Sequence, residues 1–247
     1  MEDLLERWQL TLGDEYPSGA AGRAFRVRRA DGTAAVLKVQ NPHRESEQEA
    51  DALERWAGDG AVKLLARDDT RHALLLERCE PGTFLADARV DHVGVFVALL
   101  PRLWVGADGF QTLAEEAESW IELGLGRARH GNVAVGLLRE LVPMQGEQVL
   151  LHQDLHGHNV LAAEREPWLV IDPKPLAGER EFAVAPIVRS CELGHSRRDA
   201  LYRLDRLTGE LGLDRERARG WTIAQTIAWS GGSEYIATHM ETVEWLL

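Results

Sequence analysis

Hydrophobic and polar residues alternate along the N-terminal part of the chain. Leucines alternate with polar residues in residues 8–13, and apolar residues alternate with arginines in residues 24–29. Such alternation places every second side chain on one face, as in a half-buried strand. Asp31-Gly32 is a strong signal for a hairpin turn between residues 24–29 and 34–39. The pattern therefore predicts three antiparallel strands at the N-terminus.

The pattern changes to helical spacing at residues 46–57, where apolar residues recur every three positions. Two short apolar runs, residues 62–65 and 73–76, predict further strands. The segment 78–82, Arg-Cys-Glu-Pro-Gly, then breaks the pattern. We place a boundary between two lobes at this break.

Beyond this boundary the pattern is mainly helical. Helices are predicted for residues 91–104, 113–129, 133–141 and from 196 onward, and short strands for residues 149–151, 160–162 and 168–171. The predicted fold class is therefore α+β and bilobal. Residues 1–78 would form the smaller lobe, an antiparallel sheet with one helix. Residues 79–247 would form the larger, mainly helical lobe.

Composition and charge narrow the class of protein. The 247 residues are 45% hydrophobic and 28% charged, which suits an ordinary buried core. With 28 Lys and Arg against 40 Asp and Glu, the net charge is −12. That charge argues against a protein that wraps nucleic acid, and it would attract a cationic small molecule.

Cysteine content and apolar runs bear on the compartment. The two cysteines, Cys79 and Cys191, are too few for a disulfide framework, so we expect a reduced, cytoplasmic setting. The longest apolar run, residues 93–100, is too short to span a bilayer. We expect no membrane partner, and a monomer or a weak homodimer.

Two segments carry the residue types that phosphoryl transfer needs. Asp154 and Asn159 lie in a polar stretch between two apolar runs, and Asp172 follows the next apolar run. One carboxylate can orient an attacking hydroxyl and accept its proton, while an amide oxygen and a second carboxylate can hold Mg²⁺ beside the phosphates. An Asp–Asn pair at this spacing arises easily by chance. Its weight comes from Asp172 and from an upstream lysine.

That lysine is Lys38, in the apolar run Ala-Val-Leu-Lys-Val. Burying a lysine is costly unless its charge is paired. The phosphates of a nucleotide and a glutamate of the following helix would pair it, with Glu49 as the first candidate and Glu45 as the second. An edge-strand lysine that reaches solvent is an equally weighted alternative. Lysine occurs at only three positions, Lys38, Lys63 and Lys174, so a specific chemical demand is more plausible at each.

With these residues in place, the chain resembles an aminoglycoside phosphotransferase, particularly the aminoglycoside/hydroxyurea antibiotic resistance kinase group. The resemblance implies a protein-kinase-like fold, ATP and Mg²⁺ as cofactors, and transfer of the γ-phosphoryl group to a hydroxyl of a streptomycin-like aminoglycoside. It covers nearly the whole chain and is weakest in the last fifty residues. The matching segments are 36–39, 49–53, 74–78 with Pro81-Gly82, 152–159 and 171–174.

The resemblance also assigns roles at the centre of the site. Asp154 resembles the catalytic base of the family. Asn159 and Asp172 resemble its Mg²⁺ ligands. Lys38 resembles the phosphate-binding lysine, and Glu49 its ion-pair partner.

Further positions are assigned at the edges of the nucleotide site. Glu77 and Cys79 lie where the backbone would bind adenine, and Gly19 and Gly22 belong to a turn that would cover the phosphates. That turn lacks the full glycine pattern of protein kinases. Ala183 stands where relatives usually carry an aspartate that braces the catalytic loop, and this departure leaves a nucleotide-binding pseudokinase open as an alternative.

The acceptor is the least constrained part of the prediction. Glu192, Glu234 and Glu241 are candidates for binding a cationic substrate, although a solvated acidic surface explains most acidic residues of the chain. A kinase of another small amine or sugar metabolite is the alternative enzyme.

A histidine-zinc site is a further alternative reading of the polar stretch. His152, His156 and His158 are the candidate ligands, and His152 and His156 would share a face if the stretch were helical, but its glycine and its apolar flanks predict a loop. Histidines that brace this loop are therefore favoured over a zinc site.

Overall fold

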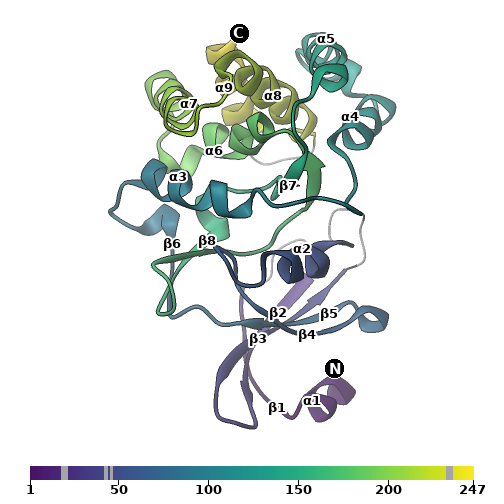
Figure 1. Cartoon of the computed structure of the whole chain (residues 1–247), viewed down its shortest axis with the longest axis vertical. Helices are drawn as coiled ribbons and strands as arrows, with labels where there is room; N and C mark the ends of the chain where they lie inside the picture. The colour runs from purple at the N-terminus through teal and green to yellow at the C-terminus, as the bar shows by residue number, and fades with distance from the viewer. Residues whose placement is uncertain (18–21, 42–43, 45–46, 232–235) are drawn as a thin grey trace.

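The computed structural model of the chain describes residues 1–17, 22–41, 44, 47–231 and 236–247. A β-rich part built from the first third of the chain lies beside a larger, mainly helical part, and both chain ends lie far from the junction between them (Figure 1). The α+β fold class predicted from the sequence is confirmed. The division into lobes at residue 78 stays a prediction.

The N-terminal part is a five-stranded antiparallel sheet in the order β1-β2-β3-β5-β4. The three N-terminal strands, and the further strands near residues 62–65 and 73–76, are confirmed with shifted ends. Their bounds are β1 Leu10–Glu15, β2 Gly22–Arg29, β3 Ala34–Gln40, β4 Leu64–Asp68 and β5 Ala73–Glu77.

The central strand β3 sends alternate side chains to opposite faces of the sheet. Ala35 and Leu37 are fully buried in a small core on one face. The short helix α1, Glu2–Arg7, adds Leu4 to this core. Lys38 therefore points to the other face, toward α2. The sequence pattern did not predict α1, because one buried leucine in six residues gives no periodic signal.

Helix α2, Glu49–Trp56, lies between the sheet and the helical part (Figure 1). It begins later than the predicted residue 46, and Ala57 ends it in the left-handed conformation (φ 50°). The buried indole of Trp56 donates to the Leu103 carbonyl at 2.9 Å. Helix α2 is thereby attached to the helical part and holds its first residue, Glu49, over β3.

The second part contains seven α-helices among the residues the structure describes, packed around two small sheets. The predicted helix 113–129 is wrong in its length, because α4 ends at Glu122 and Gly124 follows with φ 101°. The helices are α3 His92–Leu103, α4 Leu113–Glu122, α5 Gly131–Leu141, α6 Ala185–Arg189, α7 Arg197–Leu211, α8 Arg215–Ala228 and α9 Ile236–Leu246.

The small sheets of the second part present the two loops of interest. β7 pairs with β10, while β8 pairs with both β6 and β9. β6 and β10 were not predicted, and β6 begins inside the segment interpreted as a break. The strands are β6 Pro81–Phe84, β7 Val149–Leu151, β8 Val160–Ala163, β9 Trp168–Val170 and β10 Leu176–Gly178.

The β-rich and helical parts are joined through β9. Val62 donates from its backbone to the Val170 carbonyl at 3.0 Å, and Val170 donates to the Gly60 carbonyl at 2.9 Å. These bonds hold the end of β9, and with it Asp172, next to the region of β3 and α2. Of the helices in the described ranges, none is long and apolar enough to cross a membrane.

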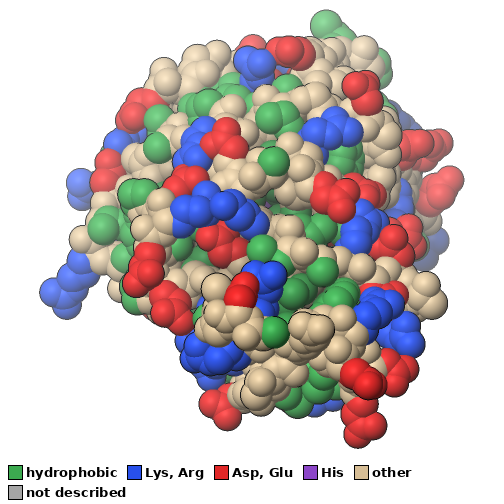
Figure 2. All heavy atoms as spheres, turned by 60° about the horizontal axis from the view of Figure 1, so that its bottom comes forward, with side chains coloured by type: hydrophobic (Ala, Val, Ile, Leu, Met, Phe, Trp, Pro, Cys, Tyr) green, Lys and Arg blue, Asp and Glu red, His purple; other side chains and the backbone are tan. Residues whose placement is uncertain are grey.

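Charged side chains are mixed over the surface. On the face drawn in Figure 2, basic and acidic side chains alternate and do not gather into one basic patch. This face therefore presents no continuous basic track of the kind that a phosphate backbone would follow.

Candidate active site

A buried lysine lies between two carboxylates from distant parts of the chain. Lys38 donates to both carboxylate oxygens of Glu49, at 2.8 and 2.6 Å, and it also pairs with Asp172. The side chains of Lys38 and Glu49 are 13% and 1% exposed, so this ion pair is shielded from water. The structure thus brings together the first-choice partners, and the edge-strand alternative for Lys38 is wrong. The second candidate, Glu45, lies outside the described residues.

The charges of this cluster are strongly coupled. Burial alone would lower the pKa of Lys38, but Glu49 and Asp172 outweigh it and raise that pKa, so the ammonium stays charged. Burial would raise the pKa of Asp172, and Lys38 lowers it overall. Burial, together with the charge of Asp172, raises the pKa of Glu49 more than Lys38 lowers it. Two carboxylates thus share one ammonium, and a cation beside Asp172 would relieve the repulsion between them.

The loop between β7 and β8 is tied to the segment after β9 by backbone hydrogen bonds. The Asn159 side-chain nitrogen donates to the Asp154 carbonyl at 2.8 Å. Ile171 donates to the Asn159 carbonyl, and Lys174 to the His152 carbonyl, each at 3.0 Å. These bonds place Asp172 beside Asn159, although the two residues belong to different loops.

This arrangement of donors fits a magnesium ion. Because Asn159 uses its amide nitrogen on the loop, its amide oxygen is left as a ligand atom, and Asp172 supplies a carboxylate that is 35% exposed. Mg²⁺ prefers such oxygen ligands and keeps several waters. Asn159 and Asp172 are therefore the residues that could hold the metal.

Two residues of these loops have left-handed backbone conformations that are uncommon for side chains with a Cβ. Gln153 has φ 62° and Asp172 has φ 55°. Such conformations cost free energy and persist where the surroundings hold them, often at functional sites. Here they turn the chain just before Asp154 and at the predicted metal ligand.

A buried glutamine of α8 braces the strained loop. Gln225 is fully buried and donates to the Gln153 carbonyl at 2.8 Å. Its own oxygen accepts from Arg189 at 3.1 Å. Ala183 is buried, and its methyl side chain can form no hydrogen bond with the loop. The side-chain hydrogen bond to the loop is made instead by Gln225 of α8. The sequence carried no signal for this role.

Asp154 lies among cations. Lys174 pairs with one carboxylate oxygen, and Arg189 lies 3.8 Å from the other. The ring of Trp229 lies 5.2 Å from the Lys174 ammonium and 4.9 Å from the Arg189 guanidinium. Burial lowers the pKa of Arg189 to about 10. The matching segment 171–174 includes Lys174, but the motif assigned it no role. The rarity of lysine in this chain was the signal that could have identified it.

His152 has a structural role. Its Nε2 donates to the Ile171 carbonyl at 2.9 Å, and its Nδ1 accepts from the Asp154 backbone at 3.3 Å. Burial lowers the pKa of His152 to about 4, so the ring is neutral at pH 7. The stretch is a loop, and His152 braces it. Both ring nitrogens of His152 are engaged in these bonds, so His152 is not a zinc ligand.

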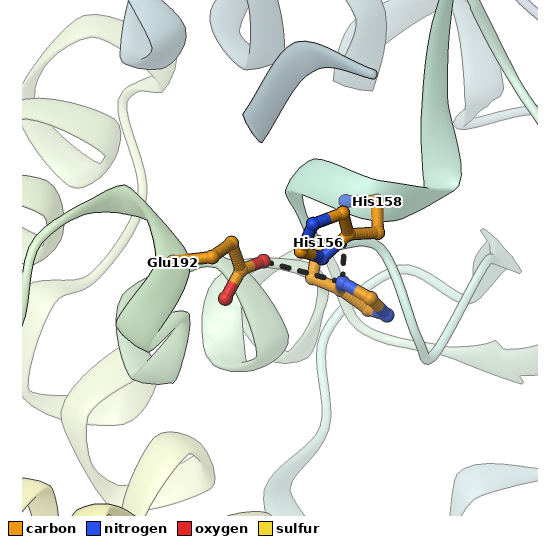
Figure 3. Close-up of side chains that lie close together, drawn as sticks. All are labelled: His156, His158 and Glu192. Atoms are coloured by element: carbon orange, nitrogen blue, oxygen red, sulfur yellow. Dashed lines mark hydrogen bonds and ion pairs between the residues drawn. The ribbon is translucent and has the colours of Figure 1, made fainter. Parts of the chain in front are cut away.

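Glu192, a predicted substrate residue, lies against the other side of the same loop. It accepts from the Gly157 backbone at 2.9 Å and lies 3.2 Å from the Nδ1 atom of His156 (Figure 3). Burial would raise the pKa of Glu192, but the hydrogen bond from His156 outweighs it and lowers that pKa to about 2. Glu192 is thus an anion close to Asp154.

The other predicted substrate residues are less informative. Glu241 of α9 is exposed and pairs with His195 at 2.7 Å, and the His195 ring packs against Trp245. Glu234 lies outside the described residues. Neither observation brings these glutamates to Asp154.

The predicted adenine-binding segment lies where β5 ends. Glu77 accepts from the Lys63 backbone at 2.9 Å and pairs with Arg165 at 2.8 Å, so its side chain is committed to structure. Burial raises the pKa of Cys79 to about 12, which excludes a thiolate at this position. Any contact with adenine would therefore use the backbone of this segment.

One glycine of the predicted phosphate-covering turn can be placed. Gly22 begins β2 with φ 156°, and a Cβ there would lie 2.5 Å from the Val39 carbonyl oxygen. Glycine is therefore required for β2 to pair closely with β3 at this end. Gly19 lies outside the described residues.

Comparison with solved structures shows the fold. Choline kinase LicA from Streptococcus pneumoniae matches with a TM-score of 0.73 at 14% identity, covering 99% of this chain and 98% of that one. Aminoglycoside phosphotransferase APH(4)-Ia matches with a TM-score of 0.67 at 16% identity, covering 99% and 94%. The fold is therefore protein-kinase-like, and it brings the Lys38–Glu49 pair together with Asp172.

Sequence comparison shows the family. The sequence model described as aminoglycoside/hydroxyurea antibiotic resistance kinase matches residues 7–233. Hydroxyurea phosphotransferase of Kitasatospora aureofaciens is 40% identical, covering 91% of this chain and 69% of that protein. Streptomycin 6-kinase of Streptomyces glaucescens is 39% identical, covering 92% and 80%. The chain belongs to the aminoglycoside/hydroxyurea antibiotic resistance kinase family, as the sequence motifs predicted.

Proposed function

We propose that this protein transfers the γ-phosphoryl group of ATP to a hydroxyl of a streptomycin-like aminoglycoside. The observation that carries the proposal is the convergence of Lys38, Glu49 and Asp172 beside the loop that holds Asp154 and Asn159. These groups are supplied by four separate segments. The similarity to streptomycin 6-kinases over most of the chain supports the choice of acceptor.

Each residue of the site has a proposed role in phosphate binding, metal binding or catalysis. Lys38, fixed by Glu49, would hold the phosphates of the nucleotide. Asn159 and Asp172 would hold Mg²⁺, which, when bound, neutralises charge on the phosphates. Asp154 would orient the acceptor hydroxyl in line with the γ-phosphorus and accept its proton.

The cations around Asp154 extend this scheme. Lys174 and Arg189 lie where negative charge accumulates during transfer, and both rest against Trp229. Preorganised positive groups at such a position stabilise the transition state without reorganising during the reaction. Asp154 keeps its ion pair with Lys174 until a nucleotide offers a stronger anionic partner.

The rest of the site follows from the same proposal. The backbone of Glu77 and Cys79 would bind the adenine, and the turn with Gly19 and Gly22 would cover the phosphates. Glu192, a buried anion near Asp154, would attract an amino or guanidino group of the acceptor. The setting would be cytoplasmic, which agrees with two free cysteines.

A second acceptor is favoured by one observation. Hydroxyurea phosphotransferase covers as much of this chain as the streptomycin kinases do, at 40% identity. Hydroxyurea carries its hydroxyl on nitrogen and no positive charge at neutral pH, so it would not need Glu192. Glu192→Gln therefore separates the two acceptors, because it should weaken streptomycin turnover and leave hydroxyurea turnover nearly unchanged.

The test is a coupled ADP-release assay with streptomycin, other aminoglycosides, simple amino sugars and hydroxyurea. Asp154→Asn keeps the size of the side chain and removes the base. We expect it to lower kcat by at least ~10²-fold and to leave ATP binding within a few-fold. Wild-type phosphoryl transfer by this variant would disprove the base assignment. ATP binding with no ADP release on any acceptor would favour a pseudokinase.

A further inference from the structure

Three metal-ligating side chains gather beside the loop that carries Asp154. His156, His158 and Glu192, here called the HHE cluster, offer ligand atoms that all lie within 4.8 Å of one another. Figure 3 shows His156, just before the short 3-10 turn at residues 157–159, and His158, within that turn, beside the Glu192 carboxylate, which comes from a separate segment. The cluster takes no part in the proposed magnesium site.

We propose that the HHE cluster is a transition-metal site of the zinc class, and that its occupancy inhibits phosphoryl transfer. Two imidazoles and one carboxylate are a common ligand set for Zn²⁺ with an open fourth position. Ligand atoms about 2.0–2.1 Å from a tetrahedral ion lie roughly 3.3 Å apart. The Nδ1 atom of His156 and Oε1 of Glu192 are already 3.2 Å apart.

The third ligand can complete the site at low cost. His158 is exposed, and its ring makes an edge contact with Phe84 at 5.4 Å between centroids. Exposed side chains change rotamer freely, so a shift of up to about 1.5 Å toward the pair needs no backbone movement.

The cluster is coupled directly to the proposed catalytic base. His156 presents its second nitrogen, Nε2, to Asp154 Oδ1 at 4.0 Å. A metal-bound histidine commonly donates its other N–H to a carboxylate, which fixes the ring. A metal on Nδ1 would therefore draw Asp154 toward His156 and away from an acceptor hydroxyl. It would also compete with the Gly157 backbone for Glu192.

The ligand chemistry separates this site from the magnesium site. Imidazole binds Zn²⁺, Co²⁺ and Ni²⁺ well, whereas Mg²⁺ prefers carboxylate, carbonyl and water oxygens. Millimolar Mg²⁺ in a kinase assay should leave the HHE cluster free. The two metals are expected to bind independently when no nucleotide is present.

Binding is tested without any enzymatic activity. The full-length protein, freed of metal with EDTA and without nucleotide, is titrated with CoCl₂ and followed by visible absorption, then with ZnCl₂ by calorimetry. We expect one ion per chain and the intense absorption bands of tetrahedral Co²⁺. His158→Ala should weaken binding by at least about tenfold. His72→Asn is the matched control, because His72 is exposed on the N-terminal sheet and asparagine tolerates its left-handed backbone (φ 48°).

Inhibition is then measured by ADP release at saturating MgATP with added ZnCl₂. Wild type and His72→Asn should lose activity in parallel with metal binding, while His158→Ala should keep its basal activity and resist Zn²⁺ at least about tenfold better. Equal metal affinity in wild type and His158→Ala would overturn the site. Stoichiometric binding that leaves ADP release unchanged would overturn the coupling to Asp154. Failure of every acceptor to support ADP release would count against the proposed function and would leave the binding result intact.

Discussion

Replacing Gln225 by methionine tests whether α8 holds the catalytic loop in place. Methionine keeps the length and approximate volume of the side chain, so the change removes two hydrogen bonds and leaves little cavity. The lost bonds are the one donated to the Gln153 carbonyl at 2.8 Å and the one accepted from Arg189 at 3.1 Å. Both partners are buried, so water cannot replace the missing group.

The magnitude follows from the groups left without a partner. An unsatisfied buried carbonyl costs about 1–3 kcal/mol, and a hydrogen bond to a charged group is worth about 1.5–3 kcal/mol. Packing of the methionine offsets part of this loss, so we expect a decrease of about 2–4 kcal/mol in the free energy of unfolding. In a chain of this size, 1 kcal/mol lowers Tm by about 2–4 °C, which predicts a drop of roughly 5–15 °C.

The rate of phosphoryl transfer should fall even under conditions where the variant stays folded. Gln153 immediately precedes Asp154, and a misplacement of about 1 Å in a reacting group can reduce a rate by up to ~10²-fold. We expect kcat to fall by at least about tenfold at a temperature where the variant is fully folded, with the KM for ATP nearly unchanged. The assays are differential scanning fluorimetry and ADP release.

Thr226→Val is the matched control. Thr226 is the neighbouring residue of α8, is also fully buried, and bonds only within its own helix, to the Thr222 carbonyl at 2.6 Å. It should cost less than about 1 kcal/mol and leave kcat unchanged. If Gln225→Met melts within 2 °C of wild type and retains its kcat, the bracing role of α8 is refuted.

Three further results are expected. Lys38→Met should raise the KM for ATP at least about tenfold, because it removes the phosphate-binding cation and leaves the buried Glu49 carboxylate without its counter-ion. The exposed Lys63→Met should not change this KM, and equal KM values in both variants would contradict the assignment. His152 is neutral in the folded chain down to about pH 4 but protonates near pH 6.5 when unfolded, so stability is lost as pH falls between these values. Urea unfolding should show wild type losing roughly 3 kcal/mol more than His152→Gln from pH 6.5 to 4, and parallel pH profiles would show that His152 is not buried as described. Gly22→Ala should lower Tm by several degrees because its Cβ meets the Val39 carbonyl, while the open Gly209→Ala should not lower it, and an unchanged Tm in Gly22→Ala would show that β2 can shift there.

Much of the architecture could be read from local pattern. Alternation in residues 24–29 and 34–39 and the turn between them predicted β2 and β3 because a half-buried strand imposes a period of two. The predictions failed where the local pattern is weak. Helix α1 buries one leucine, and β10, Leu-Ala-Gly, lacks the run of large apolar residues from which the equally short β7 was predicted.

The sequence by itself determined which chemical groups are available and their order along the chain. A lysine in an apolar strand, a glutamate at the start of a helix, and the spaced Asp, Asn and Asp were enough to predict phosphoryl transfer, because that chemistry needs those groups. The surroundings of Asp154 depend on how the chain folds in space. Gln225, Arg189 and Glu192 contact the loop over separations of 35 or more positions, and Trp229 packs against Arg189. No periodicity encodes such contacts, because they depend on how α8 and the segment after α6 pack against the loop.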